Sequence, residues 1–267
     1  MNAEQHAMKH AAAPHISLAA YLGSAGLVLA MLAGIVEALA GPGSRMGWWY
    51  FRTGFTIFTW AGIGGAAAAV ISLIGAIGAR PAGHRGAFYS ALAGVVIGLL
   101  IAAIPWAWMR TAERVPKIHD ITTDTANPPQ FEAILPLRKD ASNSSAYGGQ
   151  AIAAQQQAAY PDIKPVVLPI AAATAFDRAL IAARNMGWRI VSTDPAAGRI
   201  EATATTFWFG FTDDIVVRIT PAPGGSRIDM RSESRVGLSD MGTNAARIRK
   251  LMHKLEMASI IDPKWNG

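Results

Sequence analysis

The chain has 267 residues, of which 51% are hydrophobic, with a formal net charge of +6 and no cysteine. Without cysteine it can form no disulfide, no thiolate nucleophile and no cysteine-ligated zinc or iron–sulfur centre. Only five of the 24 basic and two of the 18 acidic residues lie in residues 1–109. The tail after residue 109 is therefore nearly balanced in charge. It also lacks a basic stripe interleaved with aromatic residues, which argues against nucleic-acid binding.

Three long apolar stretches follow an N-terminal tail of residues 1–15, at residues 16–40, 54–78 and 87–109. Each is long enough to supply the roughly 20 helical residues that cross about 30 Å of hydrocarbon. The first is too long for a cleavable signal peptide. Aromatic residues typical of the water–lipid boundary lie at the ends of the stretches, namely Trp48, Trp49, Trp106 and Trp108. The sequence therefore predicts a three-helix transmembrane region over residues 16–109.

The orientation and role of these spans follow less directly from the sequence. More basic residues flank the side that carries the tail than the side of the N-terminus, so the positive-inside count leans toward a cytoplasmic tail but does not settle the orientation. Glu37 is the one acid within a span and lies near its end, so we expect its side chain to reach the interface. Gly94 and Gly98 form a GxxxG motif, which we expect to pack against another span of this chain. With a single marginal acid, the spans indicate an anchor rather than a transporter.

Residues 110–267 read as a soluble α+β domain. The proline-containing stretch at 114–131 predicts an extended segment, and the Ala-, Ser- and Gln-rich stretch at 138–160 predicts a flexible insert, with a short helix around 150–159 as the alternative. A helix is predicted from Ala172 to Gly187 and another at 243–259. Alternating patterns predict strands at 188–193, 199–207, 213–220 and 226–236. The order predicts an antiparallel sheet with helices packed on one face.

Three polar residues suggest a hydrolase-type site. His119 and Asp120 are adjacent, and Asp214 is an acid entering a predicted strand. Against this interpretation, Asp120 could equally fix the extended segment, and Asp214 could pair with an arginine. Asp213 and Asp214 are neighbours on a strand, so their side chains should point to opposite faces rather than share a proton. The only other histidine of the tail is His253, so we expect no metal site and no cofactor.

A second candidate site is an anion-binding surface. Arg231 and Arg235 share one strand face by their spacing, and Arg218 on the neighbouring strand could join them. The alternative is a solvated ladder of cross-strand salt bridges. Trp208 and Phe209, in an aromatic run between two strands, would complete the contact surface. The loop 237–244 could hold an anion at the start of the last helix, although a structural cap is the simpler interpretation.

Several separated motifs of the tail resemble the bacterial and plastid family called domain of unknown function 1499. They include His119-Asp120-Ile121-Thr122-Thr123-Asp124, Ala159-Tyr160-Pro161-Asp162-Ile163, Phe211-Thr212-Asp213-Asp214-Ile215 and Asp229-Met230-Arg231-Ser232-Glu233-Ser234-Arg235. The resemblance covers most of residues 115–260 and carries no established reaction or catalytic residue. It implies a membrane-associated envelope protein, with the tail facing the periplasm.

Together these observations predict a multi-pass protein of the bacterial inner membrane that displays a non-catalytic binding module to the periplasm. The expected partners are the lipid bilayer and either anionic lipid headgroups or another membrane protein. The alternatives are a membrane-bound hydrolase that uses His119, Asp120 and Asp214, and an accessory subunit of a membrane complex.

Overall fold

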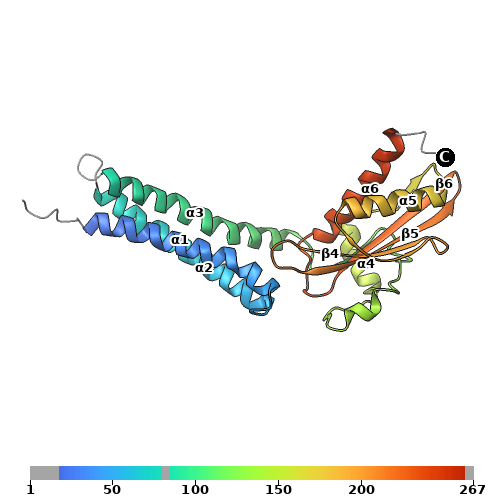
Figure 1. Ribbon diagram of the computed structural model, residues 1–267, viewed down its shortest axis with the longest axis horizontal. Helices are drawn as coiled ribbons and strands as arrows, with labels where there is room; N and C mark the ends of the chain where they lie inside the picture. The colour runs from blue at the N-terminus through green and yellow to red at the C-terminus, as the bar shows by residue number, and fades with distance from the viewer. Residues whose placement is uncertain (1–17, 80–84, 262–267) are drawn as a thin grey trace, which may run out of the picture. The chain divides into compact units, whose positions relative to one another are not determined.

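A computed structural model describes residues 18–79 and 85–261 of the chain (Figure 1). The N-terminal tail, the start of the first predicted span and most of the loop 79–86 lie outside the described residues. The chain divides into two compact units, Met1–Trp108 and Met109–Gly267. Each unit is described by itself below.

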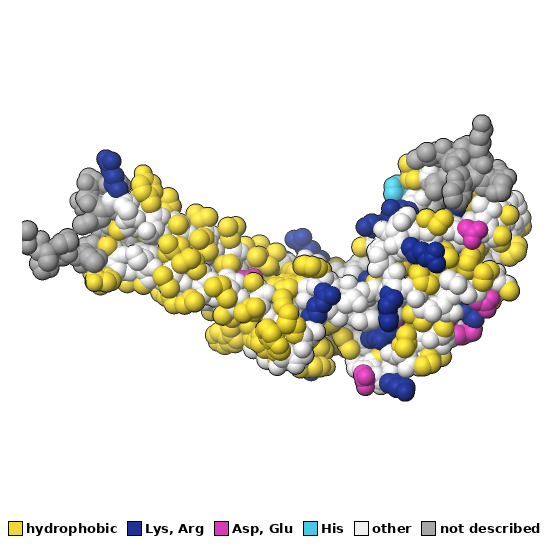
Figure 2. Space-filling model, viewed as in Figure 1, with side chains coloured by type: hydrophobic (Ala, Val, Ile, Leu, Met, Phe, Trp, Pro, Cys, Tyr) yellow, Lys and Arg dark blue, Asp and Glu magenta, His cyan; other side chains and the backbone are white. Residues whose placement is uncertain are grey.

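The first unit consists of the long helices α1 (Leu18–Arg45), α2 (Phe51–Ala79) and α3 (Arg85–Arg114), the last of which continues past Trp108. All three are long and apolar enough to cross a membrane. Most of their large apolar side chains are exposed, as expected of surfaces that face lipid, and Figure 2 shows hydrophobic side chains gathered over these helices. The chain is therefore a membrane protein, and the prediction of three apolar helices is confirmed.

Small residues bring these helices into close contact. Gly94 and Gly98 of α3 are both buried, and a Cβ atom added at Gly98 would collide with Gly65 and Ala69 of α2. A Cβ atom added at Gly94 would collide with Ser72 of α2. The GxxxG motif is thus used for packing within this chain, as its sequence predicts.

Glu37 differs from its prediction. Its side chain is only 3% exposed, and its two carboxylate oxygens have no hydrogen-bond partner among the described residues. The expectation that Glu37 reaches the interface is therefore wrong.

The second unit is built on a six-stranded antiparallel sheet with the order β1-β6-β5-β4-β3. These strands are β1 (Asp120–Thr122), β3 (Arg189–Asp194), β4 (Arg199–Thr205), β5 (Thr212–Ala222) and β6 (Gly225–Ser234). A short strand, β2 (Val166–Leu168), pairs with β6 further along the edge that β1 occupies. The four longer strands were predicted from their alternating pattern, whereas β1 and β2 are too short to show one.

Helices α5 (Ala172–Asn185) and α6 (Thr243–Ile261) pack on one face of the sheet. The apolar core between them contains Ile215 and Val217 of β5, Ile228 and Met230 of β6, and Leu251 of α6. Helix α5 ends at Asn185, and Gly187, two residues later, has a φ of 76°, a conformation that glycine adopts without strain. The predicted α+β fold, with helices on one face of an antiparallel sheet, is confirmed.

The opposite face of the sheet is covered by residues 123–148, which we call the covering segment. It contains one 3₁₀ turn, η1 (Leu135–Arg138), and it is followed by helix α4 (Gly149–Ala159). Phe131 and Ile134 of this segment pack on Val216 of β5 in a second, smaller apolar cluster. The flexibility predicted for residues 138–160 stays a prediction. The structure adds that Arg138, Asn143 and Gln156 of this stretch are hydrogen-bonded to the sheet.

Candidate functional site

The face of the sheet beneath the covering segment carries charged side chains. The face that helices α5 and α6 cover carries apolar ones. Every second residue of a strand points to the same face, so the residues that alternate with the apolar core share this side. Arg231 and Glu233 of β6 and Asp214 of β5 are fully buried here, and Asp120 of β1 is nearly so. The strand register pairs Glu233 with both Asp120 and Asp214 and thereby brings three carboxylates together.

Arg231 lies at the centre of this cluster. Its Nε and Nη2 atoms donate to the two carboxylate oxygens of Asp120 at 2.9 and 2.8 Å. Nη2 also donates to the carbonyl oxygen of Ser145 at 2.8 Å, and the guanidinium lies 4.7 Å from the ring centre of Phe131. The tyrosine ring of Tyr147 lies 5.6 Å away. These contacts occupy both the donors and the planar faces of the guanidinium group.

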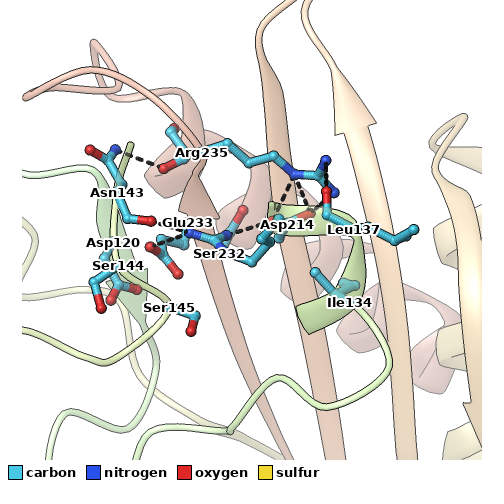
Figure 3. Close-up of polar contacts among 12 residues, drawn as sticks. Asp120, Ile134, Leu137, Asn143, Ser144, Ser145, Asp214, Ser232, Glu233 and Arg235 are labelled. Atoms are coloured by element: carbon cyan, nitrogen blue, oxygen red, sulfur yellow. Dashed lines mark hydrogen bonds and ion pairs between the residues drawn. The ribbon is translucent and has the colours of Figure 1, made fainter. Parts of the chain in front are cut away.

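Two further arginines converge on Asp214, and Figure 3 shows one of them, Arg235, reaching this carboxylate. Arg138, from η1, donates to Asp214 and also to Glu233 Oε1 at 2.9 Å. Arg235, which follows β6, donates through Nη2 to Asp214 Oδ1 at 2.8 Å and through Nη1 to the carbonyl oxygen of Leu137 at 2.7 Å. One side chain from the covering segment and one from the strand end thus bind the same carboxylate.

The cluster contains three arginines and three carboxyl groups. Its arginines are Arg138, Arg231 and Arg235, and its acids are Asp120, Asp214 and Glu233. The pKa of Glu233 is raised to about 8, chiefly by burial and then by the charge of Asp120, against the opposing effect of Arg138 and Arg231. Burial likewise raises the pKa of Tyr147 to about 12. A buried cluster of this kind is costly to break, because removal of one member leaves its partner's charge uncompensated.

The covering segment is also held by Glu201 of β4, which is almost fully buried. Its carboxylate accepts hydrogen bonds from the backbone N–H groups of Glu132, Ala133 and Ile134, at 2.9–3.1 Å. These N–H groups lie just before the η1 turn and have no partner within it. The Glu201 carboxylate, from the sheet, therefore caps the start of this turn.

Asp213 faces the helices instead. Its carboxylate accepts a hydrogen bond from Arg247 Nη2 of α6 at 2.6 Å, and burial raises its pKa despite that arginine. Asn244 of α6 donates to the carbonyl oxygen of His119 at 3.0 Å and accepts from Ser232 at 2.7 Å. The side chains of Asp213 and Asp214 therefore lie on opposite faces of the sheet, as expected of adjacent residues in a strand.

In the loop 237–244, the backbone N–H groups at the start of α6 are bound by a side chain of the loop itself. Asp240 accepts hydrogen bonds from the backbone N–H groups of Gly242 and Asn244 at 2.9 and 2.7 Å, where α6 begins. Its pKa is raised, chiefly by burial and against these two hydrogen bonds. Because a carboxylate already binds these amides, the loop has the geometry of a structural cap.

The residues of the predicted hydrolase site lie in this framework. Asp120 binds Arg231, whereas Asp214 binds Arg138 and Arg235. The carbonyl oxygen of His119 accepts hydrogen bonds from Ser234 and Asn244. Among residues 18–79 and 85–261, no group of three His, Cys, Asp or Glu side chains could hold a metal ion.

The three arginines of the predicted anion surface do not form one exposed face. Arg231 is fully buried, and Arg235 is mostly buried against Asp214. Arg218 lies toward the other end of β5, where it donates to Asp229 at 3.0 Å and to Asp124 at 3.3 Å. The alternative of a cross-strand salt-bridge ladder describes Arg218 and Asp229, which are register partners. It does not describe Arg231, which is buried rather than solvated.

The aromatic run between β4 and β5 also contains both buried and exposed side chains. Phe209 is buried and stacks on Phe211 at 5.6 Å between ring centres, and Trp208 lies 5.3 Å from Phe209. Phe207 is instead 90% exposed. Of the large apolar residues that the structure describes, it is the most exposed, and Leu238 follows at 78%.

Sequence reasoning missed Arg138, Glu201 and Arg247. Arg138 stands in a stretch without periodicity, and Glu201 alternates with apolar residues as a solvent-facing residue does. No local signal separates a solvent-facing strand position from one covered by an irregular segment. Arg247 could have been found from the sequence, because it lies three residues after Asn244 near the capped start of a predicted helix, so the two side chains share one helix face.

A family model described as "Protein of unknown function (DUF1499)" matches residues 120–255. The chain belongs to this family. The match begins at β1 and ends within α6, so it contains the sheet, the covering segment and the buried charge cluster. The three apolar helices lie outside it. The resemblance inferred from the motifs is confirmed for this DUF1499 domain. Comparison with curated proteins gives no match.

Proposed function

We propose that this protein is a bacterial inner-membrane protein that displays its DUF1499 domain to the periplasm as a non-catalytic binding module. The proposal assigns the anchor to the three apolar helices and the recognition to the domain that defines the family. The charged cluster serves as an internal support, because its side chains are buried and bound to one another.

One observation carries the binding role, namely the exposure of Phe207 and Leu238. Both exceed the exposure of the lipid-facing side chains of the apolar helices, although they belong to the soluble unit. Large apolar side chains exposed together commonly mark a surface that binds another molecule. We therefore assign the contact surface to Phe207, between β4 and β5, and to Leu238, after β6, instead of to Arg218, Arg231, Arg235, Trp208 and Phe209. The hydrolase alternative gains no support from the ion-paired positions of Asp120 and Asp214.

Photocrosslinking in living cells tests the binding role. p-Benzoylphenylalanine placed at Phe207 or at Leu238 should give crosslinked products, whereas the same group at Val167 should give none. Val167 is a suitable control because it is also apolar and exposed, but it pairs with Arg227 at the far end of β6. Equal crosslinking at all three positions, or none at any, would contradict the proposal. A crosslinked membrane protein would assign the accessory-subunit role.

The periplasmic side can be tested separately, because the chain has no native cysteine. Lys164 is an exposed residue of the soluble domain, and Gly86 is an exposed residue at the start of α3. Each would be replaced by a single cysteine. A membrane-impermeant maleimide added to intact cells with a permeabilised outer membrane should label Lys164→Cys and not Gly86→Cys. The reverse pattern would place the domain in the cytoplasm.

A further inference from the structure

Phe207 and Leu238 lie at the same end of the sheet. Phe207 is in the turn that joins Thr205 of β4 to Thr212 of β5, which are register partners. Leu238 follows the end of β6, where Ser234 pairs with Asp213 of β5. The two loops that carry these side chains therefore emerge next to one another.

The chain enters the domain from α3 at this same end. β1 begins at Asp120, opposite Glu233 near the end of β6. The loop that contains Leu238 is bonded to the entering segment, because Ser239 Oγ donates to the carbonyl oxygen of Pro116 at 3.2 Å. The backbone N–H of Asp240 also donates to the carbonyl oxygen of Ile118 at 3.2 Å. Leu238 is thus fixed beside the residues that lead out of the membrane helix.

The tether between the apolar unit and this point is short. The apolar unit ends at Trp108, and α3 continues to Arg114, only two residues before Pro116. Six helical residues rise about 9 Å, and two extended residues add about 7 Å. The headgroup region is roughly 5–8 Å thick on each side of the hydrocarbon. The chain therefore reaches Pro116 no more than about 16 Å from the end of the apolar unit.

The tether also carries exposed positive charge. Arg114 and Lys117 are both exposed, and Arg110 forms an exposed ion pair with Glu113. Basic residues at a membrane surface attract anionic lipid headgroups, while apolar side chains beside them gain free energy by leaving water. A membrane surface explains why the basic and the apolar side chains both lie at the end of the domain that is joined to α3. A soluble protein partner would not require this.

We propose that Phe207 and Leu238 insert into the headgroup region of the membrane that holds the anchor, while Arg114 and Lys117 bind anionic phospholipid headgroups. This inference rests on the proposed binding function and names its occupant as the lipid surface.

The inference can be tested with the full chain in nanodiscs. Single cysteines at Phe207, Leu238 and Val167 would each carry an environment-sensitive nitrobenzoxadiazole label. The discs would contain phosphatidylcholine, with or without phosphatidylglycerol, and with or without doxyl-labelled phosphatidylcholine as a quencher in the membrane. We expect quenching by the doxyl lipid at positions 207 and 238, none at 167, and stronger quenching when phosphatidylglycerol is present.

The double variant Arg114→Gln/Lys117→Gln should remove the added effect of phosphatidylglycerol, because it removes the charges that attract this lipid. Absence of doxyl quenching at positions 207 and 238 would overturn the inference. If these positions nevertheless crosslink to a protein in cells, the binding function stands and only its lipid occupant is wrong. If neither quenching nor crosslinking occurs, both proposals fail.

Discussion

The side-chain amide of Gln156 makes the two hydrogen bonds with Thr122 that a neighbouring strand would make. Gln156 Oε1 accepts from the backbone N–H of Thr122 at 2.9 Å, and Nε2 donates to the carbonyl oxygen of Thr122 at 2.7 Å. Thr122 is the last residue of the edge strand β1. A residue of helix α4 therefore completes the edge of the sheet, where unpaired backbone groups would otherwise be buried without partners.

Replacement of Gln156 by Glu should destabilise the domain, because the carboxylate cannot donate to the carbonyl oxygen of Thr122. We expect a loss of about 1–3 kcal/mol, which is typical of a buried polar group left unsatisfied. The sequence provides a matched control in the exposed neighbour Gln155, for which Gln155→Glu should cost little. Hydrogen exchange at the Thr122 amide and urea unfolding would measure both. Similar results for the two variants would contradict the assigned role.

Arg231→Met should destabilise the domain by about 3–5 kcal/mol, because it leaves Asp120 and Glu233 buried without their central cation. The control is Arg184→Met, which removes an exposed arginine at the end of α5. Chemical unfolding in mild detergent would compare the variants. If Arg231 contacts a ligand instead of supporting the fold, Arg231→Met will unfold like the control while it loses binding.

The raised pKa of Glu233 predicts a pH dependence of stability. This pKa moves from 4.5 to about 8 in the folded domain. Between these pH values the folded state keeps a proton that the unfolded state has lost, so the free energy of unfolding falls as the pH rises. The fall should level off above about pH 8.

Glu233→Gln isolates this contribution, since the amide imitates the protonated acid in shape and does not titrate. The variant should lose less stability than the parent between about pH 5 and pH 8. Asp213 and Asp240, whose pKa values are also raised, remain in both proteins. Urea unfolding at a series of pH values would give the two profiles, with Asp140→Asn as a control at an exposed acid. Parallel profiles for the parent and Glu233→Gln would refute the assignment.

Glu37→Leu should stabilise the helical unit, because it removes two buried oxygens that lack a partner among the described residues. A gain of about 1–3 kcal/mol is expected from the relief of an unsatisfied buried group. Thermal unfolding in detergent would compare it with Glu113→Leu, a change at an exposed acid of α3. A loss of stability in Glu37→Leu would mean that the carboxyl group binds a partner such as water or lipid.

The fold was largely predictable because most of its elements are long and periodic. The three apolar helices and the strands from Arg189 to Ser234 each repeat a pattern over several residues. Strands β1 and β2 have three residues each, which is too short for alternation to appear. Their pairing depends on β6, which is distant from β1 in sequence.

The charge cluster was predictable only in part. The spacing of Arg231, Glu233 and Arg235 placed them on one face, and the structure bears this out. What covers that face depends on residues 123–148, which have no periodic apolar pattern. Phe131 gave no sign that it would lie over Arg231, since a single aromatic residue in a proline-rich stretch has no preferred partner. The exposed Phe207 could not be separated from its buried neighbour Phe209 for the same reason.

The position of Asp120 also has a mechanical consequence. It is the first residue of the first strand, and the chain that reaches it comes directly from α3. Any tension between the anchor and the domain is therefore applied to residues 116–120, which end at Asp120, whose carboxylate is held by two hydrogen bonds from the buried Arg231. Through this ion pair the load reaches β6, an interior strand of the sheet that also pairs with β1. A bidentate, buried ion pair thus lies close to the point where the membrane would pull on the domain.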